Sequence, residues 1–158
     1  MAGLRNYHGA CCDMVVEVVR STGSADLRVT GLSMLPAIWP GDLVTVQRQD
    51  SSELRRGQVI LFARNGRLTA HRVVEVASGH ILTRGDSSPT CDSPLKWIDV
   101  VGQVVGVRRN GRLVSPKPSI WQGVAALILR RSAWCSRLFL HLSSRMRRLR
   151  VPEPTFEY

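Results

Sequence analysis

Short runs with a β pattern, separated by turn signals, follow one another from Leu27 to Leu113. Each run is rich in β-branched or alternating apolar residues, which is typical of strands. The runs are Leu27–Val29, Leu43–Val46, Val59–Phe62, Arg72–Val76, His80–Thr83 and Val100–Arg108. Asn65-Gly66 and Asn110-Gly111 are strong signals of two-residue hairpins between such runs. Because a closed sheet leaves few strand edges open, we predict a mainly β domain that forms a closed or nearly closed antiparallel barrel.

Composition and length fit one compact domain with helical appendages. The chain has 158 residues, of which 44% are hydrophobic and 22% charged, as in an ordinary globular protein. We predict an N-terminal helical segment in residues 1–24, with a short amphipathic helix from Ala10 to Arg20. The β domain is predicted in residues 25–115, and the proline-rich segment Ser115–Pro118 marks its end.

The pattern then changes to that of a basic amphipathic helix in residues 116–150, followed by a tail in residues 151–158. Residues 118–158 hold seven arginines and two glutamates, within a formal net charge of +10 for the chain. The apolar positions recur at helical spacing: Trp121, Val124, Ile128, Cys135, Leu138, Leu142, Met146 and Leu149. Such a helix can lie on an anionic membrane surface, or it can pack on the β domain with its arginines in solvent. Nucleic-acid binding is not expected, because no recognisable reading module accompanies the arginines.

Neither end of the chain is expected to cross a membrane. The segment Ile120–Leu142 is long enough for a span, but Arg130, Arg131 and Arg137 would be costly at the centre of a bilayer. The apolar run Met14–Val19 is short and contains a charge, whereas a span needs about 20 mainly apolar residues. The first residues also lack the pattern of a secretory signal. We therefore expect a cytoplasmic protein or one bound peripherally to a membrane.

Ser33 is the candidate nucleophile of this chain. It lies between Gly31, which allows the backbone to approach a substrate closely, and Pro36, which restricts the exit of the turn. Taken alone, a serine in such a segment is more often an ordinary turn residue. The functional interpretation therefore depends on partners elsewhere in the chain.

Candidate partners for Ser33 follow in the order base, then carboxylate. A serine hydroxyl is a weak nucleophile near neutral pH, so it needs a base to take its proton, and the base needs a group to orient it. His71 is the candidate base, and Asp86 and Asp92 are the candidate carboxylates. We expect Asp86 to be the residue that orients His71. Each of these side chains also has an ordinary structural interpretation, as a strand histidine or a turn aspartate.

Several sequence boxes from about Val29 to Val107 resemble those of the membrane signal peptidases, which share a β fold with LexA-type self-cleaving proteases. The boxes are Ser33-Met34-Leu35-Pro36, Gly41-Asp42, Gly57–Phe62, His71–Val74 and Gly85-Asp86 through Cys91-Asp92-Ser93. Bacterial signal peptidases and LexA-type proteins have a lysine base, so His71 makes this chain similar to the archaeal and endoplasmic-reticulum branch. The resemblance implies that Ser33 is the nucleophile and His71 the base, with support from Asp86 and Asp92.

The resemblance also implies an activity, that of a serine endopeptidase which cleaves signal or leader peptides through an acyl-enzyme. The substrate would be an extended peptide with small residues just before the cut. Because imidazole has an unperturbed pKa of ~6.5, we predict that activity rises with pH through one ionisation at about 6 to 7. The backbone N–H of Ser33 is the expected oxyanion donor, since Gly31 has no side-chain donor.

Three positions depart from the family pattern, and two other functions stay open. Gln58 replaces an aspartate, Ser87 replaces an asparagine, and Cys91 stands where bacterial enzymes often have serine. One alternative is a LexA-like self-cleaving regulator, although the stretch before Ser33 is short for a DNA-binding module and the lysine base is absent. The other is a non-catalytic peptide-binding or membrane-associated protein on the same scaffold.

The cysteines predict no metal site and no disulfide framework. They stand at positions 11, 12, 91 and 135, without Cys-x-x-Cys spacing and without a matching histidine pattern. We expect no cofactor and a reducing compartment.

Overall fold

The computed structural model describes residues 2–115. The predicted basic helix in residues 116–150 and the tail after it lie outside the described residues. The first described element is α1, an α-helix that spans Ala2–Thr22, and it is longer than the predicted helix from Ala10 to Arg20. In the described part of the chain, no helix is both long and apolar enough to cross a membrane.

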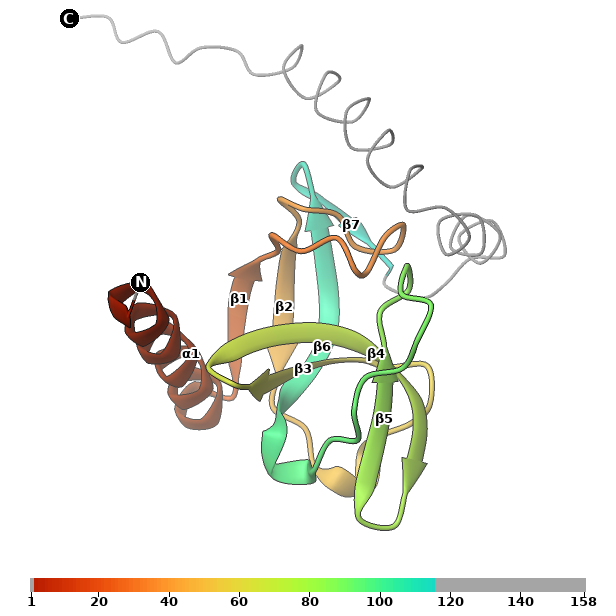
Figure 1. The fold of residues 1–158 in the computed structure, drawn as a ribbon. Coiled ribbons are helices and arrows are strands. Elements are labelled where there is room, and N and C mark those ends of the chain that lie inside the picture. The colour runs from red at the N-terminus through yellow and green to blue at the C-terminus, as the bar shows by residue number, and fades with distance from the viewer. Residues whose placement is uncertain (1, 116–158) are drawn as a thin grey trace, which may run out of the picture.

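The predicted mainly β domain is confirmed. Its strands form one antiparallel sheet in the order β1-β2-β6-β3-β4-β5, and β7 pairs with β6 (Figure 1). The strands are β1 (Ser24–Arg28), β2 (Leu43–Gln47), β3 (Val59–Arg64), β4 (Arg67–Ala77), β5 (His80–Arg84), β6 (Val100–Arg109) and β7 (Arg112–Val114). Two short 3-10 helices, η1 (Ser51–Glu53) and η2 (Trp97–Asp99), lie in the connections.

Both predicted Asn-Gly hairpins are present. Asn65 and Gly66, with φ of 52° and 69°, join β3 to β4, and Asn110 and Gly111, with φ of 51° and 76°, join β6 to β7. Positive φ at both central residues is the requirement of the turn whose twist matches antiparallel strands, and asparagine followed by glycine meets it at low cost. Local turn chemistry therefore sets the register of both hairpins.

Of the predicted closed or nearly closed barrel, only the closed form is wrong, because the sheet stays open between β1 and β4. β1 pairs with β2 alone and ends the sheet. β4 is long, and its second half pairs with β5 from Arg72 to Ala77, whereas its first half, residues 67–70, pairs only with β3. The outer edges of β1 and of residues 67–70 therefore have no strand partner within residues 2–115. Alternating apolar residues are compatible with an open as well as a closed sheet, so the sequence pattern did not distinguish them.

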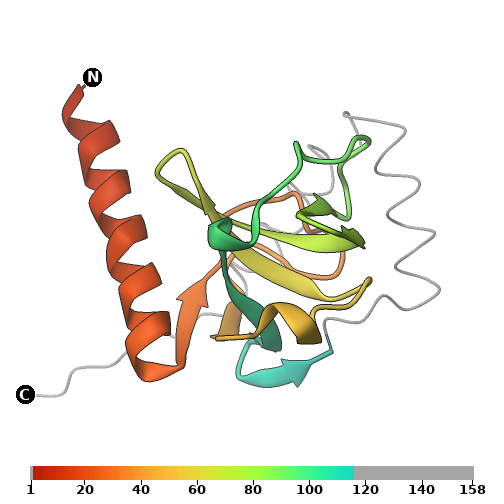
Figure 2. The same ribbon diagram turned by 90° about the horizontal axis from the view of Figure 1, so that it is seen from below.

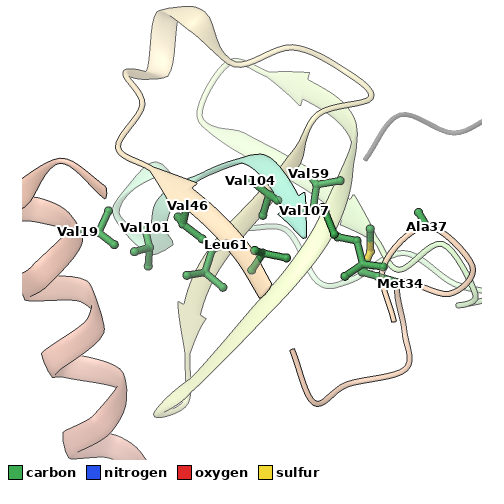
Figure 3. Packing of buried hydrophobic residues seen from close by; sticks show 11 residues of the cluster. Val19, Met34, Ala37, Val46, Val59, Leu61, Val101, Val104 and Val107 are labelled. Carbon is green, nitrogen blue, oxygen red and sulfur yellow. The ribbon is translucent and has the colours of Figure 1, made fainter. Parts of the chain in front are cut away.

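A valine-rich core joins α1 to the sheet and to the loop that carries Ser33. Figure 3 shows this cluster, with Val19 of α1 at one end and Met34 and Ala37 at the other. Gly23 follows the last residue of α1, and its φ of 84° suits a helix C-cap, while its N–H donates to the Val19 carbonyl at 3.1 Å. Val19 is fully buried, which stabilises the packing of the helix by about 1.5–3 kcal/mol. The helix is therefore held against the domain at its C-terminal end.

The other half of α1 meets the β3–β4 hairpin. Both ribbon views place the tip of this hairpin beside α1 (Figures 1 and 2). A Cβ added to Gly66 in the hairpin turn would lie 3.5 Å from the Cα of Gly9 in the helix. The backbones of the helix and the hairpin turn therefore lie close together at this point.

Candidate active site

Ser33 lies on a compact loop between β1 and β2. The pairing of these strands continues one step beyond β1, because the Val29 N–H donates to the Asp42 carbonyl at 2.9 Å and the Gly41 N–H donates to the Val29 carbonyl at 2.7 Å. The residues that follow Ser33 turn back into the protein, and the Leu35–Pro36 peptide bond is cis. The apolar side chains of this turn are buried: Met34, Leu35, Ala37 and Ile38. Burial of its neighbours holds the loop, and so Ser33, in one place.

Asp42 anchors the end of the same loop. Its carboxylate, which is 1% exposed, accepts hydrogen bonds from the Trp39 N–H at 2.7 Å and from the Arg109 Nη2 at 2.7 Å. The Arg109 guanidinium also lies over the Trp39 ring, 5.4 Å from its centroid. The indole Nε1–H donates to the Pro36 carbonyl at 2.8 Å. The Gly41-Asp42 box therefore positions the Ser33 loop without touching Ser33 itself.

His71 comes from β4 and meets Ser33 directly. Its Nε2 lies 2.8 Å from the Ser33 Oγ, although the two residues are 38 positions apart in the chain. The imidazole is nearly buried, with the residue 7% exposed, and the Phe62 ring packs against it edge-on at a centroid distance of 6.0 Å. The expected contact between nucleophile and base is therefore present in the geometry.

Asp92 is the carboxylate beside His71. Its Oδ2 lies 2.6 Å from the His71 Nδ1, and the hydroxyl of Thr83 donates to the same oxygen at 2.6 Å. An ionised carboxylate only accepts hydrogen bonds, so the His71 Nδ1 carries the proton in this contact. The Nε2 of a neutral imidazole is then an acceptor, which suits removal of a proton from Ser33. The arrangement is a chain of hydrogen bonds from Thr83 through Asp92 and His71 to Ser33.

Asp86 does not contact His71, contrary to our expectation that it orients the base. Its two carboxylate oxygens accept hydrogen bonds from the Arg72 Nε at 2.8 Å and the Arg72 Nη2 at 2.7 Å. Successive side chains of a strand point to opposite faces, so the side chains of Arg72 and His71 lie on different faces of β4. The segment after β5 then folds back along it, because the Asp92 N–H donates to the Thr83 carbonyl at 2.8 Å. This return places Asp92, rather than Asp86, on the face of His71.

Residues 85–88 hold the backbone of Ser33 from the other side. A Cβ added to Gly85 would lie 2.7 Å from the Ser33 carbonyl oxygen and 2.9 Å from the Ser33 Cβ, so only glycine fits without displacement. The N–H of Ser87 donates to the Ser33 carbonyl at 2.9 Å, and the Ser87 hydroxyl donates to the same oxygen at 3.0 Å. Ser87, noted in the sequence only as a departure from the family pattern, thus contacts the candidate nucleophile.

A cavity of about 380 Å³ opens beside Ser33, in the gap between β1 and β4. The segment from Leu27 to Gly31 lines one side and Leu68–Ala70 the other, with an apolar floor that includes Ile38, Val44 and Leu61. A larger cavity of about 680 Å³ lies around Gly57, Val105 and Leu113, but neither Ser33 nor His71 lines it. The smaller cavity is the candidate substrate site because Ser33 lines it.

The remaining predicted positions take no part in this contact chain. The Gln58 Oε1 accepts a hydrogen bond from the Arg55 N–H at 2.7 Å and so stabilises a turn. Cys91 is exposed, and the cysteines at 11, 12 and 91 are free thiols. Among residues 2–115, no three His, Cys, Asp or Glu side chains gather in a way that could hold a metal ion.

Sequence reasoning missed the role of Thr83. It is fully buried at the end of β5 and supports Asp92 through both its hydroxyl and its carbonyl. A threonine on the same strand face as the apolar Ile81, two positions before the Gly85-Asp86 box, was the available signal. A buried hydroxyl needs a hydrogen-bond partner, and a carboxylate in the next loop could have supplied it.

Comparison with known proteins adds one finding to this geometry. Residues 9–105 match the sequence profile of the Peptidase S24-like family, a region that includes Ser33, His71, Thr83 and Asp92. A search of curated proteins finds no significant match. The family match confirms the broader expectation of a serine-peptidase scaffold of the LexA and signal-peptidase type.

Proposed function

Because this chain belongs to the Peptidase S24-like family, we propose that it is a serine endopeptidase in which Ser33 is the nucleophile and His71 the general base. The observation that carries the proposal is the unbroken contact chain from Ser33 through His71 to Asp92, with distances of 2.8 Å and 2.6 Å. A family match alone would leave a non-catalytic protein equally possible. A structural histidine does not require both a serine hydroxyl and a partly buried carboxylate on its two nitrogens.

The reaction follows from the protonation state of His71. As the Ser33 Oγ attacks the scissile carbonyl carbon, its proton passes to the His71 Nε2, and Asp92 stabilises the imidazolium that forms. When the tetrahedral intermediate collapses, the C–N bond breaks and the imidazolium gives its proton to the departing amine. The acyl group stays on Ser33 as an ester. His71 then takes a proton from water as the water oxygen attacks the ester, and it gives this proton to the Ser33 Oγ when the C–O bond to the acyl group breaks and the acid leaves.

The oxyanion of the intermediate would be bound by the backbone N–H of Ser33. Within residues 2–115 this N–H donates to no other group, although the carbonyl of the same residue is held by Ser87. A fixed loop with a free N–H is a preorganised donor for developing negative charge. Gly31, two residues earlier, leaves open space in front of the loop.

The substrate would be an extended peptide that enters the gap between β1 and β4. Both flanking edges lack a strand partner in the described residues, so an extended chain could form main-chain hydrogen bonds there by β-augmentation. The apolar cavity beside Ser33 would take the side chain just before the cut. In the archaeal and endoplasmic-reticulum branch that the His71 box resembles, such substrates are signal or leader peptides, which we propose as the substrate class.

Cleavage of a peptide library by matched variants tests the proposal. We expect mass spectrometry to detect an acyl-enzyme in the wild type but not in Ser33→Ala. We expect His71→Ala to lower kcat/KM by about 10²–10⁴-fold. Ser21→Ala, at the exposed end of α1, and His80→Ala, at the start of β5, are the matched controls and should cleave normally. Unchanged cleavage by Ser33→Ala would refute the mechanism. Peptide binding without cleavage by the wild type would favour the non-catalytic alternative, and shortening of the protein's own chain would favour self-cleavage.

A further inference from the structure

The cavity beside Ser33 continues into a second one that ends at α1. The second cavity, of about 540 Å³, shares four lining residues with the first: Thr30, Gly31, Leu68 and Thr69. Its far wall is helical and consists of Cys11, Cys12 and Val15 of α1. The two cavities are therefore adjacent, and together they form a path, called the groove below, from Ser33 along the gap in the sheet to the N-terminal helix.

The helical wall packs against the domain through one face of α1. Cys12 is 3% exposed and Val19, two turns later, is fully buried, so one face of α1 is packed against the domain. Toward the N-terminus, Gly9 of the helix lies next to Gly66 at the tip of the β3–β4 hairpin. A wall that is already ordered can bind a side chain without a large loss of its own conformational entropy.

We propose that α1 forms an outer subsite for substrate residues that lie upstream of the residue just before the cut. This inference rests on the proposed function, because it assigns the apolar cavity beside Ser33 to the residue before the cut. The groove continues from that cavity toward α1, so the next residues it receives lie further toward the N-terminus of the substrate. An extended chain advances about 3.3 Å per residue, and four upstream residues therefore span about 13 Å of groove.

The lining predicts which side chain the outer subsite accepts. Cys11, Cys12, Val15 and Leu68 provide thiol and aliphatic surface, and no acidic residue lines this cavity. Arg67 is the charged residue of the lining, so a basic substrate side chain would face a like charge. We therefore expect an apolar side chain to be preferred over lysine at this point.

The first experiment compares two peptides that share the best cut site found in the peptide library. One carries two residues upstream of the cut and the other carries eight. We expect wild-type kcat/KM to be about tenfold higher for the longer peptide, which corresponds to burial of roughly one apolar side chain. Cys11→Trp, which fills the groove, should remove most of this advantage. Met14→Trp is the matched control, because Met14 is 61% exposed on the same helix and does not line the groove. An equal advantage in both variants, or an advantage from downstream residues instead, would overturn the inference.

The second experiment detects binding without catalysis, in a Ser33→Ala background. Cys11 and Cys91 are exposed, whereas burial raises the pKa of the Cys12 thiol, with a further contribution from Asp13, so N-ethylmaleimide should modify Cys11 before Cys12, and peptide mapping follows the modification of Cys11 separately from that of Cys91. The longer peptide should slow this modification and the shorter one should not. A Met14→Cys variant reports general shielding and should react at the same rate with either peptide.

The two experiments separate failure of the inference from failure of the proposed function. If the wild type cleaves peptides but the longer peptide leaves Cys11 as reactive as before, the outer subsite is wrong and the peptidase proposal stands. If no peptide is cleaved but the longer one protects Cys11, the proposed function fails while the groove is supported as a peptide-binding site.

Discussion

The two faces of β4 each carry a contact between a basic side chain and an aspartate, with different consequences. His71 and Arg72 are neighbours in the chain, and each contacts an aspartate from the segment after β5. His71 pairs with Asp92 and faces Ser33, whereas Arg72 pairs with Asp86 and also donates from Nη1 to the Gly57 carbonyl at 2.8 Å. The period of two in a strand thus separates a pair suited to proton transfer from a pair that links parts of the fold.

The largest expected effect is on the His71 face. Asp92→Asn keeps the shape of the side chain but replaces an acceptor with an amide that can reverse the imidazole tautomer. We expect kcat to fall about 10³–10⁴-fold, with the free energy of unfolding changed much less. Peptide cleavage and urea denaturation of the same preparation measure both quantities. A kcat within a few-fold of wild type would remove Asp92 from the proposed mechanism.

The corresponding change on the Arg72 face should reverse this pattern. Asp86→Asn weakens a bidentate pair whose side chains are only 13% and 14% exposed, and we expect the free energy of unfolding to fall by about 1–3 kcal/mol. At a temperature where the variant is folded, kcat should stay within a few-fold of wild type. If Asp86→Asn lowers kcat as much as Asp92→Asn does, the two faces are not separate in function.

Changes in pH should also distinguish the two pairs. The proposed base acts only when it is neutral, so kcat/KM should rise with pH, by about tenfold per unit on the acidic side, and then reach a plateau. Arginine stays protonated throughout this range, so the charge of Arg72 does not change and adds no step to the pH profile. A rate that still climbs above about pH 9 would indicate a lysine base instead.

The smallest expected effect comes from the residue behind Asp92. Thr83→Val keeps the shape of the side chain and removes the hydroxyl that donates to Asp92 at 2.6 Å. We expect kcat to fall about 10- to 100-fold, which corresponds to the usual cost of one hydrogen bond to a charged group. Thr83→Ser restores a donor and should recover most of the rate. If Thr83→Ser is as slow as Thr83→Val, packing rather than the hydrogen bond explains the loss.

The outcome of the sequence predictions depended on how local each feature is. Strand positions and both Asn-Gly hairpins were predicted because alternation and positive φ are properties of a few adjacent residues. The pairing of Ser33 with His71 was suggested by the order of the family boxes and is present in the geometry. The prediction that Asp86, and not Asp92, orients His71 was wrong, because the choice depends on how residues 85–92 fold back on β5.

The sequence by itself determined the elements of this protein and the chemical types at its site: β-branched runs, turn residues, and a serine, a histidine and two aspartates in a recognisable order. Only the tertiary structure decided which aspartate meets the histidine, that the sheet stays open beside Ser33, and that α1 lines the end of the resulting groove. The physical reason is the range of the interactions. Propensities and turns act between neighbouring residues, whereas a site depends on contacts between segments that are brought together only by the packing of the core.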